Sequence, residues 1–391
     1  MLARDLARTV GHDPERTARA WLARSPSFPD GVDWAELLVL AQRHRLSGLL
    51  VDALGKAGWL DAIPPTAYEQ LHHWAGMARS RQLELEAALG ELAARHPAEI
   101  GRVVLLKGAA SYREYGERTH RLMADFDILF SAADFEVVEP SFAALGYWRK
   151  ESLNGPTYYR ASDNPDGKLA MDVHVLGPSK YYRPEEALSP KWLTETERYE
   201  VGGVTVRRPL PVWQFVNVVT HAHEHLHSWI HAVAEDDIRA IRFLDAELLL
   251  ERYDIDPAAA WDLAVELDLH GEYALGLWSW REVRSGLPDR LAGVLPLLDR
   301  LGEVGELSAL PRGRFARWPV PLAERAWLVD RLGLALGLEP EHSGPHWGAL
   351  QEWYRTRGML PEERENVEGI AARAREVIEA AEVPAGSTAG G

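Results

Sequence analysis

Two aspartates lie one residue apart inside an otherwise apolar run, "MADFDILF" at residues 123–130. In a β-strand, residues i and i+2 share a face, so Asp125 and Asp127 project side by side while Phe126 and Ile128 point to the opposite face. Two carboxylates held together in mostly apolar surroundings repel each other, which raises at least one pKa or requires a cation. Mg²⁺ suits such oxygens and keeps positions for phosphate. The pattern therefore predicts a metal site.

A third carboxylate, Asp172, lies in the predicted strand "AMDVHVL", which a neighbouring place in the sheet would set against the first pair. Three carboxylates can hold two ions about 3.5 to 4 Å apart, a geometry that activates an attacking hydroxyl and stabilises the leaving oxygen in phosphoryl transfer. His174 shares the strand face of Asp172 and could orient an acceptor hydroxyl or take its proton. The alternative is a structural histidine.

The turn "LLKGAAS" at residues 105–111 supplies a second element of a phosphoryl-transfer site. Gly108 stands where a strand gives way to a helix, so backbone N–H groups there can face a phosphate without an intervening side chain. Lys107 and Arg121 are nearby cations for triphosphate oxygens. They could equally be surface residues or partners of nearby acids.

A rival motif is "HEHLH", in which His223, Glu224 and His227 have the His-Glu-x-x-His spacing of zinc hydrolases. Three fixed positions arise readily by chance in a histidine-rich helix, and such histidines can also line a packed helix face. Further histidines and possible third ligands are close in sequence: His221, His225, His231, Glu235, Asp236, Asp237 and Glu247. A third alternative is a catalytically inactive protein that keeps the fold and binds a nucleotide or a partner.

The elements that must position these residues follow from hydrophobic periodicity. The spacing is helical up to about residue 98, with Asp33 placed as a helix cap. A short strand at 103–106 then stops at Gly108, which predicts strand, tight turn and helix. The remaining predicted elements are a helix from 109 to 115, a strand in "FDILF", a helix ending at Gly146, a strand in "KLAMDVHVLG", a hairpin at 197–208 around Gly202 and Gly203, and helices from 211 to about 382.

Composition narrows the function classes. The 391 residues carry a formal net charge of −16, which argues against broad contact with a polynucleotide backbone. Residues 101–183 hold 11 Lys and Arg and 11 Asp and Glu, so this segment is neutral and tolerates an anionic ligand. Cysteine is absent, which excludes disulfides and thiolate chemistry and fits a reducing compartment. With no secretory pattern or membrane-spanning run, we expect a cytoplasmic protein.

These motifs resemble the uncharacterised-type nucleotidyltransferases of the polymerase-β-like superfamily. The resemblance covers roughly residues 30–280. It is carried by "LLKGAA", Arg121 four residues before "DFDILF", "GY" at 146–147, "MDVHVL", "THAHEHLH" and "IRFLDAELLL". It implies transfer of a nucleoside monophosphate from an NTP, with ATP the expected one, using Mg²⁺ or Mn²⁺. One departure from the superfamily is that Ala109 and Ala110 follow Gly108, where a second glycine or a serine is usual.

By this resemblance, Asp125 and Asp127 bind metal, Asp172 completes the triad and Gly108 lies against the triphosphate. The nucleotide is expected to contact Lys107, Gly108, Ala109, Ser111 and Arg121. The acceptor is expected to be a small molecule or peptide, not a long nucleic acid. The predicted fold is α+β: a minimal nucleotidyltransferase core, a small mixed sheet with helices, flanked by N- and C-terminal helical modules. The expected segments are a helical module at 1–99, the core at 100–210, a helical module packed on it at 211–285, a helical region at 286–383 and a disordered tail at 384–391.

Overall fold

The N-terminal hundred residues form helices, as their periodicity predicts. The computed structural model describes residues 2–152, 155–163, 167–175, 189–233, 235–310, 314–338 and 361–382. The predicted cap at Asp33 is confirmed, because its side chain accepts from the backbone N–H of Glu36. The elements are α1 (Leu2–Thr9), α2 (Pro14–Arg24), α3 (Trp34–Arg43), α4 (Ser47–Lys56), η1 (Leu60–Ala62), α5 (Pro65–Arg95) and α6 (Pro97–Ile100).

A mixed seven-stranded sheet follows, in the order β3-β4-β5-β2-β1-β7-β6. β2 runs parallel to β5, and β1 runs parallel to β7, while the other neighbours are antiparallel. The predicted mixed sheet is therefore confirmed. Its elements are β1 (Val104–Leu105), α7 (Lys107–Ser111), η2 (Tyr112–Tyr115), β2 (Phe126–Leu129), α8 (Ala132–Ala144), β3 (Trp148–Ser152), β4 (Gly155–Ala161), β5 (Lys168–His174), α9 (Ser189–Thr194), β6 (Thr196–Val201) and β7 (Val204–Pro209).

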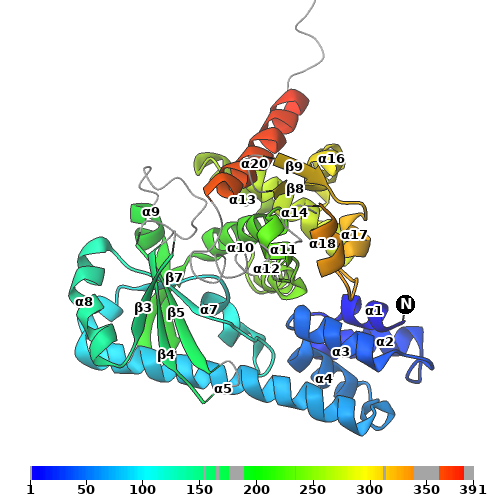
Figure 1. Cartoon of the computed structure of the whole chain (residues 1–391), viewed down its shortest axis with the longest axis horizontal. Coiled ribbons are helices and arrows are strands. Elements are labelled where there is room, and N and C mark those ends of the chain that lie inside the picture. Colours follow the sequence, from blue (N-terminus) through cyan, green and yellow to red (C-terminus); the bar gives the residue numbers. More distant parts are fainter. Residues whose placement is uncertain are drawn as a thin grey trace, which may run out of the picture. The chain divides into compact units, whose positions relative to one another are not determined.

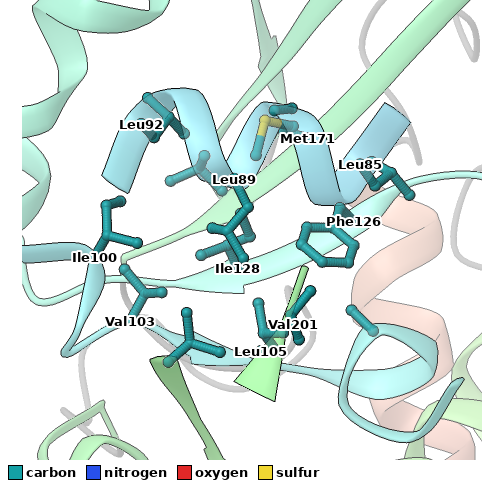
Figure 2. Close-up of a cluster of buried hydrophobic side chains, with 14 of the residues drawn as sticks. Leu85, Leu89, Leu92, Ile100, Val103, Leu105, Phe126, Ile128, Met171 and Val201 are labelled. Carbon is teal, nitrogen blue, oxygen red and sulfur yellow. The ribbon is translucent and has the colours of Figure 1, made fainter. Parts of the chain in front are cut away.

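Helix α5 covers one face of this sheet (Figure 1). Its Leu85, Leu89 and Leu92 meet Phe126 and Ile128 of β2 in a buried apolar cluster (Figure 2). The cluster also takes in Met171 and Val173 of β5, and every one of these side chains is at most 1% exposed. Because side chains alternate along a strand, this burial turns Asp127 and Asp172 to the other face of the sheet.

The turn between β6 and β7 matches the predicted hairpin. Gly202 and Gly203 have φ angles of 57° and 81°, the positive values that a tight two-residue hairpin turn needs. The hairpin of β3 and β4, in contrast, was not predicted. β3 is an edge strand rich in charged residues, and β4 carries Pro156 near its start, so neither shows the β-branched alternation that marks a strand.

The C-terminal part is mostly helical and contains one short hairpin, β8 with β9, where only helices were predicted. Its elements are α10 (Pro211–Leu226), α11 (Trp229–Val233), α12 (Ala240–Arg252), α13 (Pro257–Glu266), α14 (His270–Arg284), η3 (Asp289–Val294), α15 (Leu295–Arg300), α16 (Gly302–Gly305), β8 (Leu307–Leu310), β9 (Arg314–Arg317), α17 (Leu322–Arg325), α18 (Leu332–Leu338) and α20 (Pro361–Glu382). The tail at 384–391 lies outside the described residues.

The described chain divides into two compact units. The first holds the N-terminal helices, the sheet, the start of α10 to residue 218, and residues 239–255 with α12. The second holds residues 219–238 and the described residues from 256 onward. The carboxylates of the sheet therefore belong to the first unit, and the histidines of α10 belong to the second.

Among the described helices, none has both the length and the apolar character that a bilayer crossing requires.

Candidate functional site

Strand pairing brings the predicted carboxylates together. β2 and β5 are neighbours, and their register sets Asp127 opposite Asp172 and Leu129 opposite His174. The expectation that a neighbouring strand lays Asp172 against the first pair is confirmed for Asp127. Asp125 lies one residue before β2 begins, and its side chain is partly exposed. All of these residues belong to the first unit.

The contacts within the site are short. His174 Nε2 lies 3.1 Å from Asp127 Oδ1 and 3.6 Å from Asp172 Oδ2. The hydroxyl of Thr157, on β4, donates to Asp172 Oδ1 at 2.8 Å. Asp127, Asp172 and His174 each offer one ligand atom within 4.8 Å of the others. The His174 ring is fully buried, whereas 20% of the Asp172 side chain is exposed. Solvent therefore reaches the site from the side of the carboxylates.

Lys107 is the cation of this cluster. Its Nζ lies 2.6 Å from Asp127 Oδ1, with 17% of the side chain exposed. Lys107 is also the first residue of α7, and its φ of 49° is unusual for a residue with a side chain. Such strain costs on the order of 1 to 3 kcal/mol and gathers at functional sites. The chain thus adopts an unfavourable backbone conformation at the residue whose ammonium reaches the carboxylates.

The pKa values of Asp125 and Asp127 are shifted in opposite directions. Burial by itself would raise the pKa of Asp127, but the Lys107 ammonium and the hydrogen bond from His174 outweigh burial and hold it well below its usual range. Burial, followed by the charges of Asp127 and Asp172, raises the pKa of Asp125 to about 6. For Lys107, burial is outweighed by Asp127 and Asp172, so its pKa is raised. The site therefore carries more negative charge than Lys107 neutralises.

Arg121, expected to contact triphosphate, is instead engaged inside the protein. Its Nε and Nη2 donate to both carboxylate oxygens of Asp245, on α12, at 2.9 and 2.7 Å. Tyr115 donates to the same carboxylate at 2.7 Å. Both charged partners are buried. A Cβ added at Gly108 would lie 2.7 Å from Arg121 Nη2, so the glycine also makes room for this guanidinium.

Two further turn residues face inward. Ser111 is fully buried, and its hydroxyl donates to the carbonyl of Lys107 at 3.2 Å. Ala109 is 2% exposed and packs in the core of the sheet. Of the side chains expected to contact the nucleotide, only that of Lys107 is partly exposed and directed at the carboxylates.

Two residues of the site were missed by sequence reasoning. Thr157 lies on a strand that was not predicted, and it holds Asp172. Asp245 lies in "IRFLDAELLL", where an acidic residue among apolar ones is the signal that could have marked it as a buried partner.

The His-Glu-x-x-His residues lie in the second unit. Glu224 pairs with His221 Nδ1 at 3.0 Å. His223 and His227 are both buried, and His227 Nδ1 hydrogen-bonds the carbonyl of Leu307 at 2.8 Å. Among the described residues, no group of three possible metal ligands contains His223 or His227, the two histidines that would bind zinc in this motif. The geometry gives the zinc-hydrolase alternative no support.

The donor set on β2 and β5 fits a hard divalent cation. Carboxylate oxygens are the ligands that Mg²⁺ and Mn²⁺ prefer. Burial is the main cause of the raised pKa of Asp125, and the charges of Asp127 and Asp172 add to it, so a bound cation would favour the ionised carboxylate.

Comparison with known proteins returns one family. A family model described as an uncharacterised nucleotidyltransferase matches residues 30–284, which is well over half of the chain. Neither the curated proteins nor the solved structures gave a match.

Proposed function

The chain belongs to this uncharacterised nucleotidyltransferase family, and from that premise we propose that it transfers a nucleoside monophosphate from an NTP to a hydroxyl or phosphate of a small-molecule or peptide acceptor, using Mg²⁺ or Mn²⁺. The resemblance inferred from "LLKGAA" and "DFDILF" is thereby confirmed at the level of the family. The observation that carries the finer proposal is the register of β2 and β5, which sets Asp172 beside Asp127.

Asp125, Asp127 and Asp172 hold the divalent metal in this proposal. The metal supplies Lewis acidity at the phosphate and a more nucleophilic acceptor oxygen. His174 is a positioning residue. Its side chain is fully buried, so it contacts Asp127 and Asp172 from inside the protein and does not face solvent. Thr157 fixes the orientation of Asp172 by its hydrogen bond of 2.8 Å. Both contacts hold the carboxylates in place before a substrate arrives.

Lys107 binds the triphosphate. Its ammonium neutralises Asp127 at 2.6 Å. With a divalent cation held by the carboxylates, the ammonium would be available as a point charge for phosphate oxygens beside the turn at Gly108. Arg121 acts from behind this turn, because its guanidinium is bound to Asp245 and lies against Gly108. Arg121 therefore shapes the turn and does not bind phosphate directly.

An oxygen of the acceptor attacks the α-phosphorus in line, and the bond between that phosphorus and the pyrophosphate oxygen breaks, so that pyrophosphate leaves. Where the acceptor is a hydroxyl, its proton passes to solvent. With a formal net charge of −16, the chain lacks the electrostatic footprint of a protein that tracks a polynucleotide backbone. A small molecule or a peptide is therefore the expected acceptor, and ATP is the expected donor.

Incubation with each α-labelled NTP, Mg²⁺ or Mn²⁺ and a metabolite or lysate pool tests the proposal. Mass spectrometry reads out an added nucleoside monophosphate and so identifies the acceptor. Asp127→Asn should abolish the product while the circular dichroism spectrum stays unchanged. Asp134→Asn is the matched control, since Asp134 lies outside the site on α8, and it should keep full activity.

Three outcomes decide between the alternatives. Product that requires Asp127 and a divalent cation supports the enzyme. Unchanged turnover in Asp127→Asn rejects the assignment of the site. Tight NTP binding without transfer to any acceptor in the pool would instead favour the inactive nucleotide-binding protein.

A further inference from the structure

A second group of potential metal ligands lies in the second unit, and nucleotidyl transfer does not use it. His225 on α10, His231 on α11 and Asp236 each offer one ligand atom, all within 4.8 Å of one another. The two imidazole rings have their centroids 4.0 Å apart. His225 and His231 are buried, while the side chain of Asp236 is 23% exposed. The group is thus closed on the protein side and open at its carboxylate.

The local backbone builds this convergence. Helix α10 ends at Leu226, and the short helix α11 brings His231 back against His225. Glu235 then adopts a φ of 55°, the left-handed conformation that reverses a chain after a helix. The backbone N–H of Asp236 donates to the carbonyl of His231 at 2.8 Å. The reversal therefore carries the Asp236 carboxylate to the pair of imidazoles.

Neighbouring contacts hold the group in place. Asp237 is buried and pairs with Arg325 at 3.5 Å and Arg331 at 3.3 Å, which anchors the chain beside Asp236. His225 Nδ1 lies 3.2 Å from the backbone carbonyl oxygen of Asp236. The same nitrogen lies 3.9 Å from Asp236 Oδ2. These contacts hold the His225 ring beside the Asp236 carboxylate.

We propose that His225, His231 and Asp236 bind one first-row divalent transition metal such as Zn²⁺. At least one coordination position of that ion stays open to water or to an anionic ligand. Two imidazoles and one carboxylate suit Zn²⁺, Fe²⁺ or Co²⁺, whereas Mg²⁺ prefers oxygen ligands alone. Three protein ligands are also the number found in sites that keep an exchangeable fourth position. This site is separate from the predicted His-Glu-x-x-His set and from the carboxylates on β2 and β5.

Titration of the purified, metal-stripped protein with Co²⁺ and Zn²⁺ tests the proposal. Excess Mg²⁺ is present throughout, so that the carboxylate site is filled with an ion that competes poorly for imidazole. The wild type should take up one equivalent of Co²⁺ with visible d–d bands, and Zn²⁺ should displace it. His231→Gln and Asp236→Asn should each lower the affinity on the order of 100-fold, because loss of a direct ligand costs at least as much as loss of a second-shell partner.

Two matched variants keep the result specific. His73→Gln removes an exposed histidine of the first unit and should leave the titration unchanged. Asp127→Asn should also bind one equivalent, which separates this site from the proposed transferase site. The proposal is overturned if the folded wild type takes up no stoichiometric Co²⁺, a measurement that needs no variant to fold. It is equally overturned if His73→Gln abolishes binding, or if both folded ligand variants bind as the wild type does.

Discussion

Replacing Gly108 by alanine tests how the turn beside the carboxylates is built. The added Cβ would lie 2.7 Å from Arg121 Nη2 and 3.0 Å from its Cζ, whereas ordinary contacts begin at 3.4 Å. The guanidinium would have to move by the difference, about 0.7 Å, and both of its hydrogen bonds to Asp245 oppose that movement. Overpacking of this kind costs about 1 to 3 kcal/mol. Removing one partner of a buried ion pair, which leaves the other charge uncompensated, costs about 3 to 5 kcal/mol and sets the upper limit.

The assay is urea-induced unfolding of four proteins in a double-mutant cycle. Gly108→Ala is compared in the wild-type background and in a background that carries both Arg121→Met and Asp245→Asn, so that no buried charge is left unpaired. The Gly108→Ala substitution should cost about 1 to 3 kcal/mol in the first background and less than about 0.5 kcal/mol in the second. An equal cost in both backgrounds would refute the assigned contact. If the KM for NTP rose while stability stayed unchanged, glycine would instead be needed at position 108 for the close approach of the triphosphate.

The remaining predictions concern Thr157 and the buried His227. Thr157→Val removes the donor to Asp172 Oδ1, so the Mn²⁺ affinity of the carboxylate site should fall on the order of 10-fold in a calorimetric titration; Thr205→Val, at an exposed position on β7, should leave that affinity unchanged. Burial lowers the pKa of His227 from 6.5 to about 4, so below pH 6.5 the unfolded chain takes up a proton that the folded chain refuses. The stabilisation is therefore full above pH 6.5 and falls by about 3 kcal/mol as the pH approaches 4. His227→Gln should flatten this dependence in urea unfolding at pH 7 and pH 4.5, and an unchanged slope would contradict the assignment.

The part of the site that the sequence predicts is the part set by strand alternation. Asp127 and Asp172 interrupt apolar strands, and their convergence needs nothing more than two adjacent strands. Asp125 lies one residue before β2 begins. Thr157 was not predictable in the same way. Its strand begins with a glycine and a proline, so the local pattern indicates a loop.

The partner of Arg121 shows a different limit. Asp245 is 124 residues away along the chain, on a helix whose apolar spacing predicts burial but not the ion pair. An arginine four residues before an Asp-x-Asp pattern suggests phosphate contact by proximity in sequence alone. The structure instead shows Arg121 buried and paired with Asp245, and this burial becomes visible only when α12 is placed against the turn.

The opposite pKa shifts of Asp125 and Asp127 explain why a lysine belongs in this site. Lys107 neutralises Asp127, while burial and its two acidic neighbours raise the pKa of Asp125 to about 6. One ammonium therefore leaves the group of three carboxylates short of positive charge, and a divalent cation supplies more charge at the same oxygens than the lysine does. Under the proposed function, a divalent cation held by these carboxylates would free the ammonium at the first residue of α7, beside the turn where a triphosphate would lie. The strained φ of 49° at Lys107 is consistent with a residue held for that exchange and not for the stability of the turn.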